Sequence, residues 1–165
     1  MLRKVLLPTA VPGNLFLHSM PGLREPLGAV WRATKAVAID TIVCLAPPSE
    51  MRAKSPEYAD ALDGGSVPGR VRTFEIPDFG VPVDRNAFVS FAAEIAGQLQ
   101  SGDSVLVHCG AGIGRTGTFA VCVLMALGMN PEAARDAVET AGSAPETSGQ
   151  QELVTWCASQ GRDMA

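Results

Sequence analysis

Hydrophobic and polar positions repeat along this chain with two different periods. Four short apolar or alternating runs predict β-strands, at residues 14–19, 41–45, 70–76 and 104–108. Between them, apolar residues recur at the 3.6-residue spacing of a helix, for example at Leu27, Val30, Trp31, Thr34 and Ala38. Strands that alternate with helices predict an α/β fold, with a mostly parallel central sheet and helices on both faces.

Capping residues and proline pairs mark the ends of the predicted helices. Ser55-Pro56 starts a short helix, and Asp84 is placed as the N-cap of a longer one. Three further helices are predicted to begin after the glycine-rich turn that follows the last strand, at Asn130-Pro131, and near Thr147. Pro47-Pro48 is interpreted as a break in the chain.

Length and composition exclude several classes of protein. The 165 residues predict a single domain, residues 1–165, because two independent cores need a longer chain. Apolar residues make up 47% and charged residues 18%, the opposite of the balance found in disordered chains. The net charge of −4 argues against nucleic acid as a partner. The apolar run 119–127 is far shorter than the ~20 residues of a membrane span.

The cysteines and histidines predict no metal site, and no cofactor is implied. Cys44, Cys109, Cys122 and Cys157 form no CxxC pair, and the chain has only 2 histidines. Free thiols are typical of a reducing compartment. Two prolines interrupt the N-terminal stretch that faintly resembles a signal peptide, so export is not predicted. We therefore expect a cytoplasmic protein.

One segment joins a predicted buried strand to a predicted buried helix through a glycine-rich turn, His108-Cys109-Gly110-Ala111-Gly112-Ile113-Gly114-Arg115-Thr116. Its glycines allow the backbone to approach a ligand closely. The backbone N–H groups of such a turn converge, and the dipole of the following helix adds partial positive charge. The segment therefore predicts an oxyanion site, and residues 109–115 are called the signature loop below.

Cys109 and Arg115 give this anion site its predicted chemistry. Helix N-terminal dipoles and a neighbouring cation both favour the thiolate, which is the nucleophilic form of cysteine. Arg115 stands in the first turn of a helix, where a cation opposes the helix dipole unless it meets an anion. Its guanidinium can hold two phosphate oxygens and stabilise the transferring group. Thr116 is placed to hydrogen-bond the Cys109 sulfur.

The pair His108-Cys109, followed at fixed spacing by Gly112 and Arg115-Thr116, resembles the HCxxGxxR(S/T) signature of the cysteine-dependent protein tyrosine and dual-specificity phosphatases. The length and element order resemble the compact dual-specificity group, which includes the kinase-associated phosphatases. The resemblance implies hydrolysis of phosphotyrosine in proteins, with phosphoserine and phosphothreonine as further candidates, through a cysteinyl-phosphate intermediate. It implies that the phosphate is held by Gly110, Ala111, Gly112, Ile113, Gly114 and Arg115.

The same family supplies a general acid from a mobile upstream loop, and residues 76–82, Ile-Pro-Asp-Phe-Gly-Val-Pro, resemble that loop. Asp78 is therefore the candidate that protonates the leaving oxygen and then activates water. Asp84 is the rival carboxylate, and it ranks lower because it is well placed as a helix N-cap. Residues 77–83 are called the acid loop below.

Gln150 and His108 are predicted to assist rather than to react. Residues 147–150, Thr-Ser-Gly-Gln, resemble the family's late T-x-x-Q segment, whose glutamine positions the hydrolytic water. Threonine and glutamine at this spacing also form a helix capping box, and the two roles are compatible. His108 is expected to orient the loop through a backbone hydrogen bond, not to act as a base.

Glu50, Cys44 and Cys122 are given structural interpretations. Glu50 is interpreted as a solvated carboxylate at a helix start, with a pair to Arg115 as the alternative. Cys44 and Cys122 are expected to pack in the core, with a reversible disulfide to Cys109 as the alternative.

Competing classes fit the sequence less well. Residues 112–117 formally match GxGxxG, but a dinucleotide-binding fold needs a strand soon after that helix, where Asn130-Pro131 starts another helix. The Gly-Lys pair of a P-loop NTPase is missing. A phosphatase of a small metabolite, nucleotide or lipid remains an alternative, as does a catalytically weak phosphoprotein-binding module. The expected partner is a phosphorylated protein or peptide, and a monomer is favoured.

Overall fold

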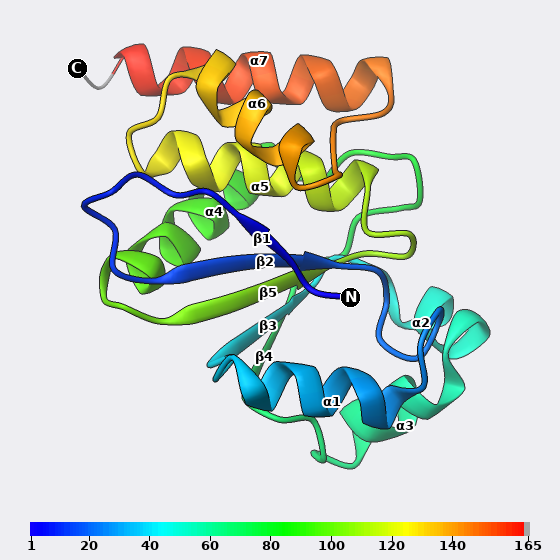
Figure 1. Cartoon of the computed structure of the whole chain (residues 1–165). Helices are drawn as coiled ribbons and strands as arrows, with labels where there is room; N and C mark the ends of the chain where they lie inside the picture. Colours follow the sequence, from blue (N-terminus) through cyan, green and yellow to red (C-terminus); the bar gives the residue numbers. More distant parts are fainter. Residues whose placement is uncertain (164–165) are drawn as a thin grey trace.

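Within residues 1–163, which the computed structural model describes, five strands form one sheet through the middle of the molecule (Figure 1). The strands are β1 (Arg3–Val5), β2 (Asn14–His18), β3 (Thr41–Cys44), β4 (Arg70–Thr73) and β5 (Ser104–His108). Their order is β1-β2-β5-β3-β4. β1 is antiparallel to β2, whereas the other three pairings are parallel, so the predicted mostly parallel sheet is confirmed.

Helices cover both faces of this sheet, as predicted. One face carries α1 (Leu27–Ala36), α2 (Pro48–Lys54) and α3 (Pro56–Asp63) (Figure 1). The other face carries α4 (Arg85–Gln100), α5 (Gly114–Ala126), α6 (Pro131–Thr140) and α7 (Ser148–Asp163). The main apolar core lies between the sheet and this second group of helices, and two smaller clusters lie under the first group.

The structure contains two elements that the hydrophobic pattern does not predict, β1 and α2. β1 has three residues, and its pairing with β2 is a tertiary contact that the pattern of so short a segment does not reveal. α2 begins at the proline pair that we interpret as a break. That interpretation is wrong because proline is well tolerated in the first turn of a helix, where its missing N–H would have no partner.

The strands predicted at 14–19 and 41–45 each end one residue early, and two further elements are also shorter than expected. β4 ends at Thr73 instead of residue 76, and α1 ends at Ala36. Ala38 is therefore exposed outside the helix, in the left-handed region with a φ of 51°. Both ends give way to loops that lead into the next element.

The centre of the sheet positions the predicted anion site. β5 lies between β2 and β3, and all five of its residues are buried. α5 is buried on all sides from Gly114 to Leu124. The signature loop therefore joins two elements that are both fixed inside the protein.

Candidate active site

The signature loop leaves the C-terminal end of β5 and enters the first turn of α5. Gly112 has a φ of 77°, in the left-handed region that favours glycine, and a side chain there would collide with the carbonyl of His18. The Met20 N–H donates to the Gly110 carbonyl over 2.8 Å, which attaches the loop to the chain after β2. Cys109 has only 2% of its surface exposed. Backbone conformation and packing thus fix the loop around Cys109.

Cys109 lines a cavity of about 230 Å³ formed by the signature loop, the acid loop, α2 and the start of α7. The lining residues are Lys54, Asp78, Phe79, Cys109, Ala111, Gly114, Arg115, Glu146 and Gln150. The predicted nucleophile, arginine, general acid and water-positioning glutamine therefore share one cavity.

Arg115 is buried, with 2% of its side chain exposed, and its guanidinium meets two carboxylates. Nη1 and Nη2 donate to the two carboxylate oxygens of Glu50 at 2.8 Å each. Nη2 also donates to Asp78 Oδ1 at 2.9 Å, and Nη1 donates to the Ile76 carbonyl at 2.9 Å. These two anions offset the unfavourable placement of a cation in the first turn of α5.

The interpretation of Glu50 as a solvated carboxylate is wrong. α2 carries Glu50 to the signature loop, where only 12% of its side chain is exposed. The hydrogen bond from Arg115 lowers the pKa of Glu50 to about 2, and Lys54 acts in the same direction. Glu50 is therefore an ionised, bidentate partner of Arg115. The sequence offers this pair only as the alternative, because the hydrophobic pattern does not predict α2.

Asp78 reaches the cavity from the acid loop. Besides its bond to Arg115, its carboxylate pairs with Lys54 Nζ at 3.3 Å and accepts the N–H of Phe79 at 3.1 Å. Lys54 also pairs with Glu50 at 2.8 Å, so one cation joins α2 to the acid loop. Phe79 has a φ of 59°, which is uncommon for a residue with a side chain and marks a local turn in this loop.

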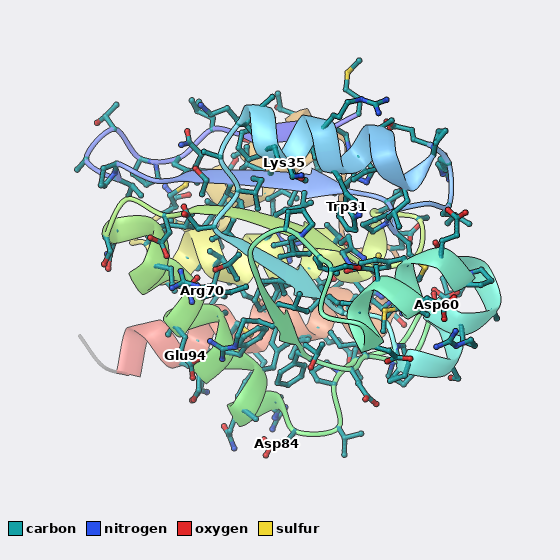
Figure 2. The ribbon with its side chains drawn as sticks, turned by 90° about the horizontal axis from the view of Figure 1, so that it is seen from below. Trp31, Lys35, Asp60, Arg70, Asp84 and Glu94 are labelled. Carbon is teal, nitrogen blue, oxygen red and sulfur yellow. The ribbon has the colours of Figure 1, made fainter. Side chains whose placement is uncertain are left out.

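Asp84, the rival acid, does not line this cavity. Its Oδ1 accepts the backbone N–H groups of Asn86 and Ala87 at 3.0 Å each, so it forms the N-cap predicted for α4. Figure 2 shows Asp84 at the outer end of α4. Its placement favours Asp78 over Asp84 as the candidate acid.

His108 is fully buried beneath the signature loop and is held on both ring nitrogens. Nδ1 lies 3.0 Å from the Cys109 carbonyl, and Nε2 lies 2.8 Å from the Tyr58 hydroxyl. Because a carbonyl can only accept, Nδ1 carries the proton and Nε2 accepts from Tyr58. Burial lowers the pKa of His108 to about 4, which keeps the ring neutral near pH 7. These contacts are those of a loop-orienting residue.

The side chain of Gln150 makes the contacts predicted for it, whereas the Thr116 hydroxyl does not. The hydroxyl oxygen of Thr116 is buried without a hydrogen-bond partner among the described residues, so the predicted bond to the Cys109 sulfur is missing. The Gln150 N–H donates to Thr147 Oγ1 at 3.2 Å, and its Oε1 accepts the Thr147 N–H at 3.3 Å, which is the predicted capping box. Its Nε2 also donates to the Gly80 carbonyl of the acid loop at 3.2 Å. Gln150 thus caps α7 and lines the cavity.

The other buried cysteines lie outside this cavity. Burial raises the pKa of Cys44 to about 12, and its thiol donates to Met51 Sδ at 3.3 Å. A hydrogen bond with Cys157, together with burial, raises the pKa of Cys122. Thiols that stay protonated attack disulfides slowly. These environments favour the core interpretation of Cys44 and Cys122.

Three further cavity residues carry no assignment from the sequence: Lys54, Phe79 and Glu146. Phe79 belongs to the acid-loop motif, but its exposure, 65% of its surface, is not visible in the sequence. Glu146 directly precedes the capping box, and its carboxylate lies against Gly114. Lys54 follows Glu50 by one helical turn, a spacing that would suggest an ion pair once α2 is known.

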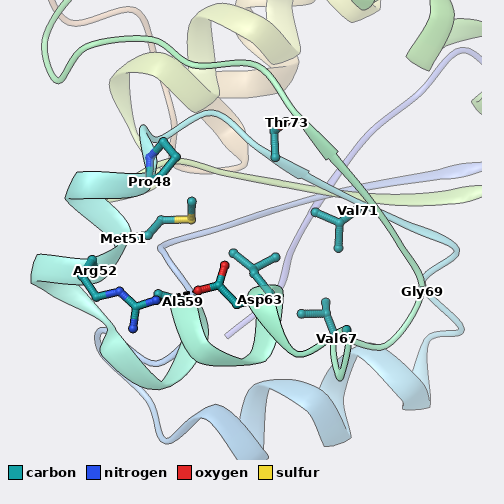
Figure 3. A pocket seen from close by; sticks show the side chains of 11 residues that line it. Pro48, Met51, Arg52, Ala59, Asp63, Val67, Gly69, Val71 and Thr73 are labelled. Atoms are coloured by element: carbon teal, nitrogen blue, oxygen red, sulfur yellow. Dashed lines mark hydrogen bonds and ion pairs between the residues drawn. The ribbon is translucent and has the colours of Figure 1, made fainter.

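A larger cavity of about 490 Å³ lies between α2, α3 and β4 (Figure 3). Arg52 and Asp63 on its lining pair with each other at 2.7 Å. It shares no lining residue with the Cys109 cavity and contains no candidate nucleophile. Among the side chains that the structure describes, residues 1–161, no three metal-ligating groups gather in one place. None of the helices within residues 1–163 has the length and hydropathy of a membrane span.

Known proteins match nearly the whole chain. A family model described as Swiss Army Knife protein, DSP-PTPase phosphatase domain, matches residues 7–159. A crystal structure of kinase associated phosphatase is 20% identical with a TM-score of 0.81, over 99% of this chain and 94% of that chain. Tk-PTP in its active form is 26% identical with a TM-score of 0.72, over 96% and 97% of the two chains.

A curated relative matches a shorter part. Tyrosine-protein phosphatase 2 of Dictyostelium discoideum is 46% identical over 43 residues, which are 26% of this chain. The match spans only 11% of that relative's length. The family model, by contrast, covers both the acid loop and the signature loop. The chain therefore belongs to the DSP-PTPase phosphatase domain family, in agreement with the resemblance of its signature loop to the tyrosine and dual-specificity phosphatases.

Proposed function

We propose that this chain is a protein phosphatase that hydrolyses phosphotyrosine through a cysteinyl-phosphate intermediate, with phosphoserine and phosphothreonine as further candidate substrates. The observation that carries this proposal is the single cavity of about 230 Å³ that Cys109, Arg115 and Asp78 share. A nucleophile, a bidentate cation and a carboxylate around one site are the groups that phosphoryl transfer to a protein side chain requires.

In the first step, the Cys109 thiolate attacks phosphorus opposite the leaving oxygen. The S–P bond forms as the P–O bond breaks, and protonated Asp78 gives its proton to the leaving oxygen. Arg115 and the backbone N–H groups of the signature loop stabilise the charge on the remaining phosphoryl oxygens. The dephosphorylated hydroxyl leaves, and phosphocysteine remains.

In the second step, water replaces the leaving group. Asp78, now a carboxylate, takes a proton from water while the water oxygen attacks phosphorus and the S–P bond breaks. Inorganic phosphate and the Cys109 thiolate are the products. Gln150 lines the cavity next to the acid loop and is the candidate that positions this water.

Arg115 has to exchange a partner when phosphate binds. Glu50 and the Ile76 carbonyl accept three of its hydrogen bonds, and Asp78 accepts one from Nη2. Nε makes none of these four bonds. A phosphate that takes Nε and the Nη2 proton now shared with Asp78 would release the Asp78 carboxylate. We therefore expect phosphate binding to free the acid at the moment when the leaving oxygen arrives.

Phe79 supports an aromatic substrate. Its ring is exposed on the cavity wall, where it can pack against the ring of phosphotyrosine. The side chains between Cys109 and Arg115 include no lysine, and around the cavity Asp78 and Glu146 balance the charges of Lys54 and Arg115. This charge pattern disfavours a highly phosphorylated lipid and favours a phosphomonoester on a protein.

The test is hydrolysis of an aryl phosphate by the wild-type chain and by Cys109→Ser, with EDTA present and vanadate as inhibitor. Cys157→Ser is the matched control, because Cys157 lies on α7 outside the cavity. We expect turnover that survives EDTA, is blocked by vanadate and is lost in Cys109→Ser alone. Phosphotyrosine and phosphoserine peptides then measure the substrate preference. Turnover retained by Cys109→Ser would overturn the mechanism.

A further inference from the structure

Arg3 joins the first strand of the sheet to the signature loop. Its Nη2 donates to the Gly112 carbonyl at 2.6 Å. Its Nη1 donates to the carbonyls of Ala141 and Gly142 at 2.9 and 2.7 Å, and to Ser143 Oγ at 2.9 Å. One side chain therefore connects β1, the signature loop and the segment between α6 and α7.

Ser143, which accepts a hydrogen bond from Arg3, also contacts the Gly112 carbonyl. Its residue surface is 2% exposed, and its hydroxyl donates to the Gly112 carbonyl at 2.6 Å. The Gly112 carbonyl thus accepts two short hydrogen bonds, one of them from a cation. Charge-assisted hydrogen bonds are stronger than neutral ones, so this carbonyl is firmly held.

The direction of this carbonyl determines the direction of the next N–H group. A trans peptide is planar, so its C=O and N–H point in opposite directions. Holding the Gly112 carbonyl toward Arg3 turns the Ile113 N–H away from Arg3. The ψ angle of Gly112 sets the orientation of the following peptide, and a residue without a Cβ restricts that angle little, so an external contact is needed to keep one orientation.

We propose that Arg3 and Ser143 are positioning residues, which hold the peptide between Gly112 and Ile113 so that the Ile113 N–H faces the bound phosphate. The proposal rests on the proposed function, because it assigns a role in binding the phosphate of that reaction. Arg3 does not line the cavity, so it acts through the loop without touching substrate. Burial lowers the pKa of Arg3, and the nearby Cys109 sulfur opposes that shift.

The experiment compares Arg3→Ala, Arg3→Lys and Ser143→Ala with the wild-type chain. Lys4→Ala is the matched control, since Lys4 is the exposed next residue of β1 and carries the same charge. Titration calorimetry measures the vanadate affinity of each variant. Steady-state hydrolysis of an aryl phosphate gives kcat/KM, and thermal unfolding shows whether the variant is folded. Loss of a charge-assisted hydrogen bond predicts that Arg3→Ala weakens vanadate binding about tenfold or more. Arg3→Lys should recover part of that loss, and Lys4→Ala should stay within about twofold of wild type.

Vanadate affinity separates a positioning role from a merely structural one. A structural role would lower the melting temperature and leave vanadate affinity unchanged in the folded protein, which would overturn the proposal. If Arg3→Ala does not fold, the test rests on Ser143→Ala and Arg3→Lys. Wild-type vanadate affinity in both of these variants would overturn the proposal. A wild-type chain that binds no vanadate would instead reject the proposed function itself, and this proposal with it.

Discussion

The signature loop and the acid loop line the same cavity, but they are held in very different ways. Cys109 and Arg115 are each 2% exposed, and contacts from β1, α2 and the chain after β2 anchor their loop. In the acid loop, Phe79 is 65% exposed and Val83 is 100% exposed. Asp78 is attached to the cavity mainly by its ion pairs with Arg115 and Lys54.

This difference matches the two tasks of the proposed reaction. Stabilising a charged transition state needs dipoles and cations that are already in place, because moving them during the reaction costs free energy. A general acid needs to approach the leaving oxygen and then to make room for water, which an exposed loop allows. On the proposed function, the molecule therefore combines a fixed candidate anion site with a loosely held candidate proton donor.

The largest expected effect is the loss of the nucleophile from the fixed loop. Cys109→Ser should lower kcat by ~10⁴ or more, because the hydroxyl is not ionised near pH 7. Vanadate should still bind, since the backbone N–H groups and Arg115 remain. The measurement is aryl phosphate turnover together with calorimetric vanadate titration. Lost vanadate binding in a folded variant would mean that the anion site depends on the sulfur itself.

Arg115→Lys should lower kcat/KM by roughly 10²–10³, because an ammonium group cannot reproduce the bidentate fork. The lysine variant also loses the two parallel hydrogen bonds that Arg115 donates to Glu50. Steady-state kinetics with an aryl phosphate measure the effect on both kcat and KM. Kinetics equal to wild type would contradict the proposed anion site.

In the acid loop, Asp78→Ala should slow hydrolysis by ~10² for substrates with poor leaving groups and less for good ones. The reason is that only a poor leaving group needs a proton in the transition state. A series of aryl phosphates of different leaving-group pKa gives the dependence. Asp84→Ala is the control, and its kcat should stay near the wild-type value. If Asp84→Ala slows the poor substrates and Asp78→Ala does not, Asp84 is the acid.

The ionised carboxylate of Glu50 is expected to contribute to the stability of the folded chain through its pair with Arg115. Because the pKa of Glu50 falls from 4.5 to about 2 on folding, its charged form stabilises the folded state fully above pH 4.5. That contribution is lost as the pH falls through this range toward 2. Urea unfolding should therefore show a stability difference between wild type and Glu50→Gln that shrinks on acidification. A difference that does not change with pH would exclude the ionised pair as its source.

The smallest effect concerns the end of the acid loop. Asp84→Ala removes the two hydrogen bonds that cap α4 and should cost about 1 kcal/mol of unfolding free energy. Urea unfolding at pH 7 measures this cost. A loss well above that of an N-cap would show that Asp84 also supports the acid loop.

The sequence predicts features whose physical cause is local. The glycine-rich turn, Cys109 and Arg115 are contiguous, and the caps at Asp84 and Asn130 depend on residues within one helical turn. The alternation of strands and helices is likewise a property of short windows. The fold class and the main candidate residues could therefore be predicted from one sequence.

The sequence does not predict the partners that tertiary packing supplies. The pair between Glu50 and Arg115 is only an alternative in the sequence, because the hydrophobic pattern does not predict α2. Nothing in the sequence indicates that Tyr58 reaches His108 from α3. Arg3 contacts a loop more than 100 residues away along the chain. No periodicity links such positions, so their roles become visible only when the sheet has brought them together.

The position of β5 has a consequence for how the chain is made. β5 pairs with β2 and β3 on its two sides, although Asn14 and Ser104, paired at one end, are 90 residues apart. During synthesis, β2 and β3 emerge long before β5 and cannot pair with each other in the native order. Their unpaired edges stay open to wrong partners until β5 inserts. Because Cys109 directly follows β5, we expect the candidate anion site and the completed sheet to form together, so a chain whose synthesis stops before β5 would carry neither.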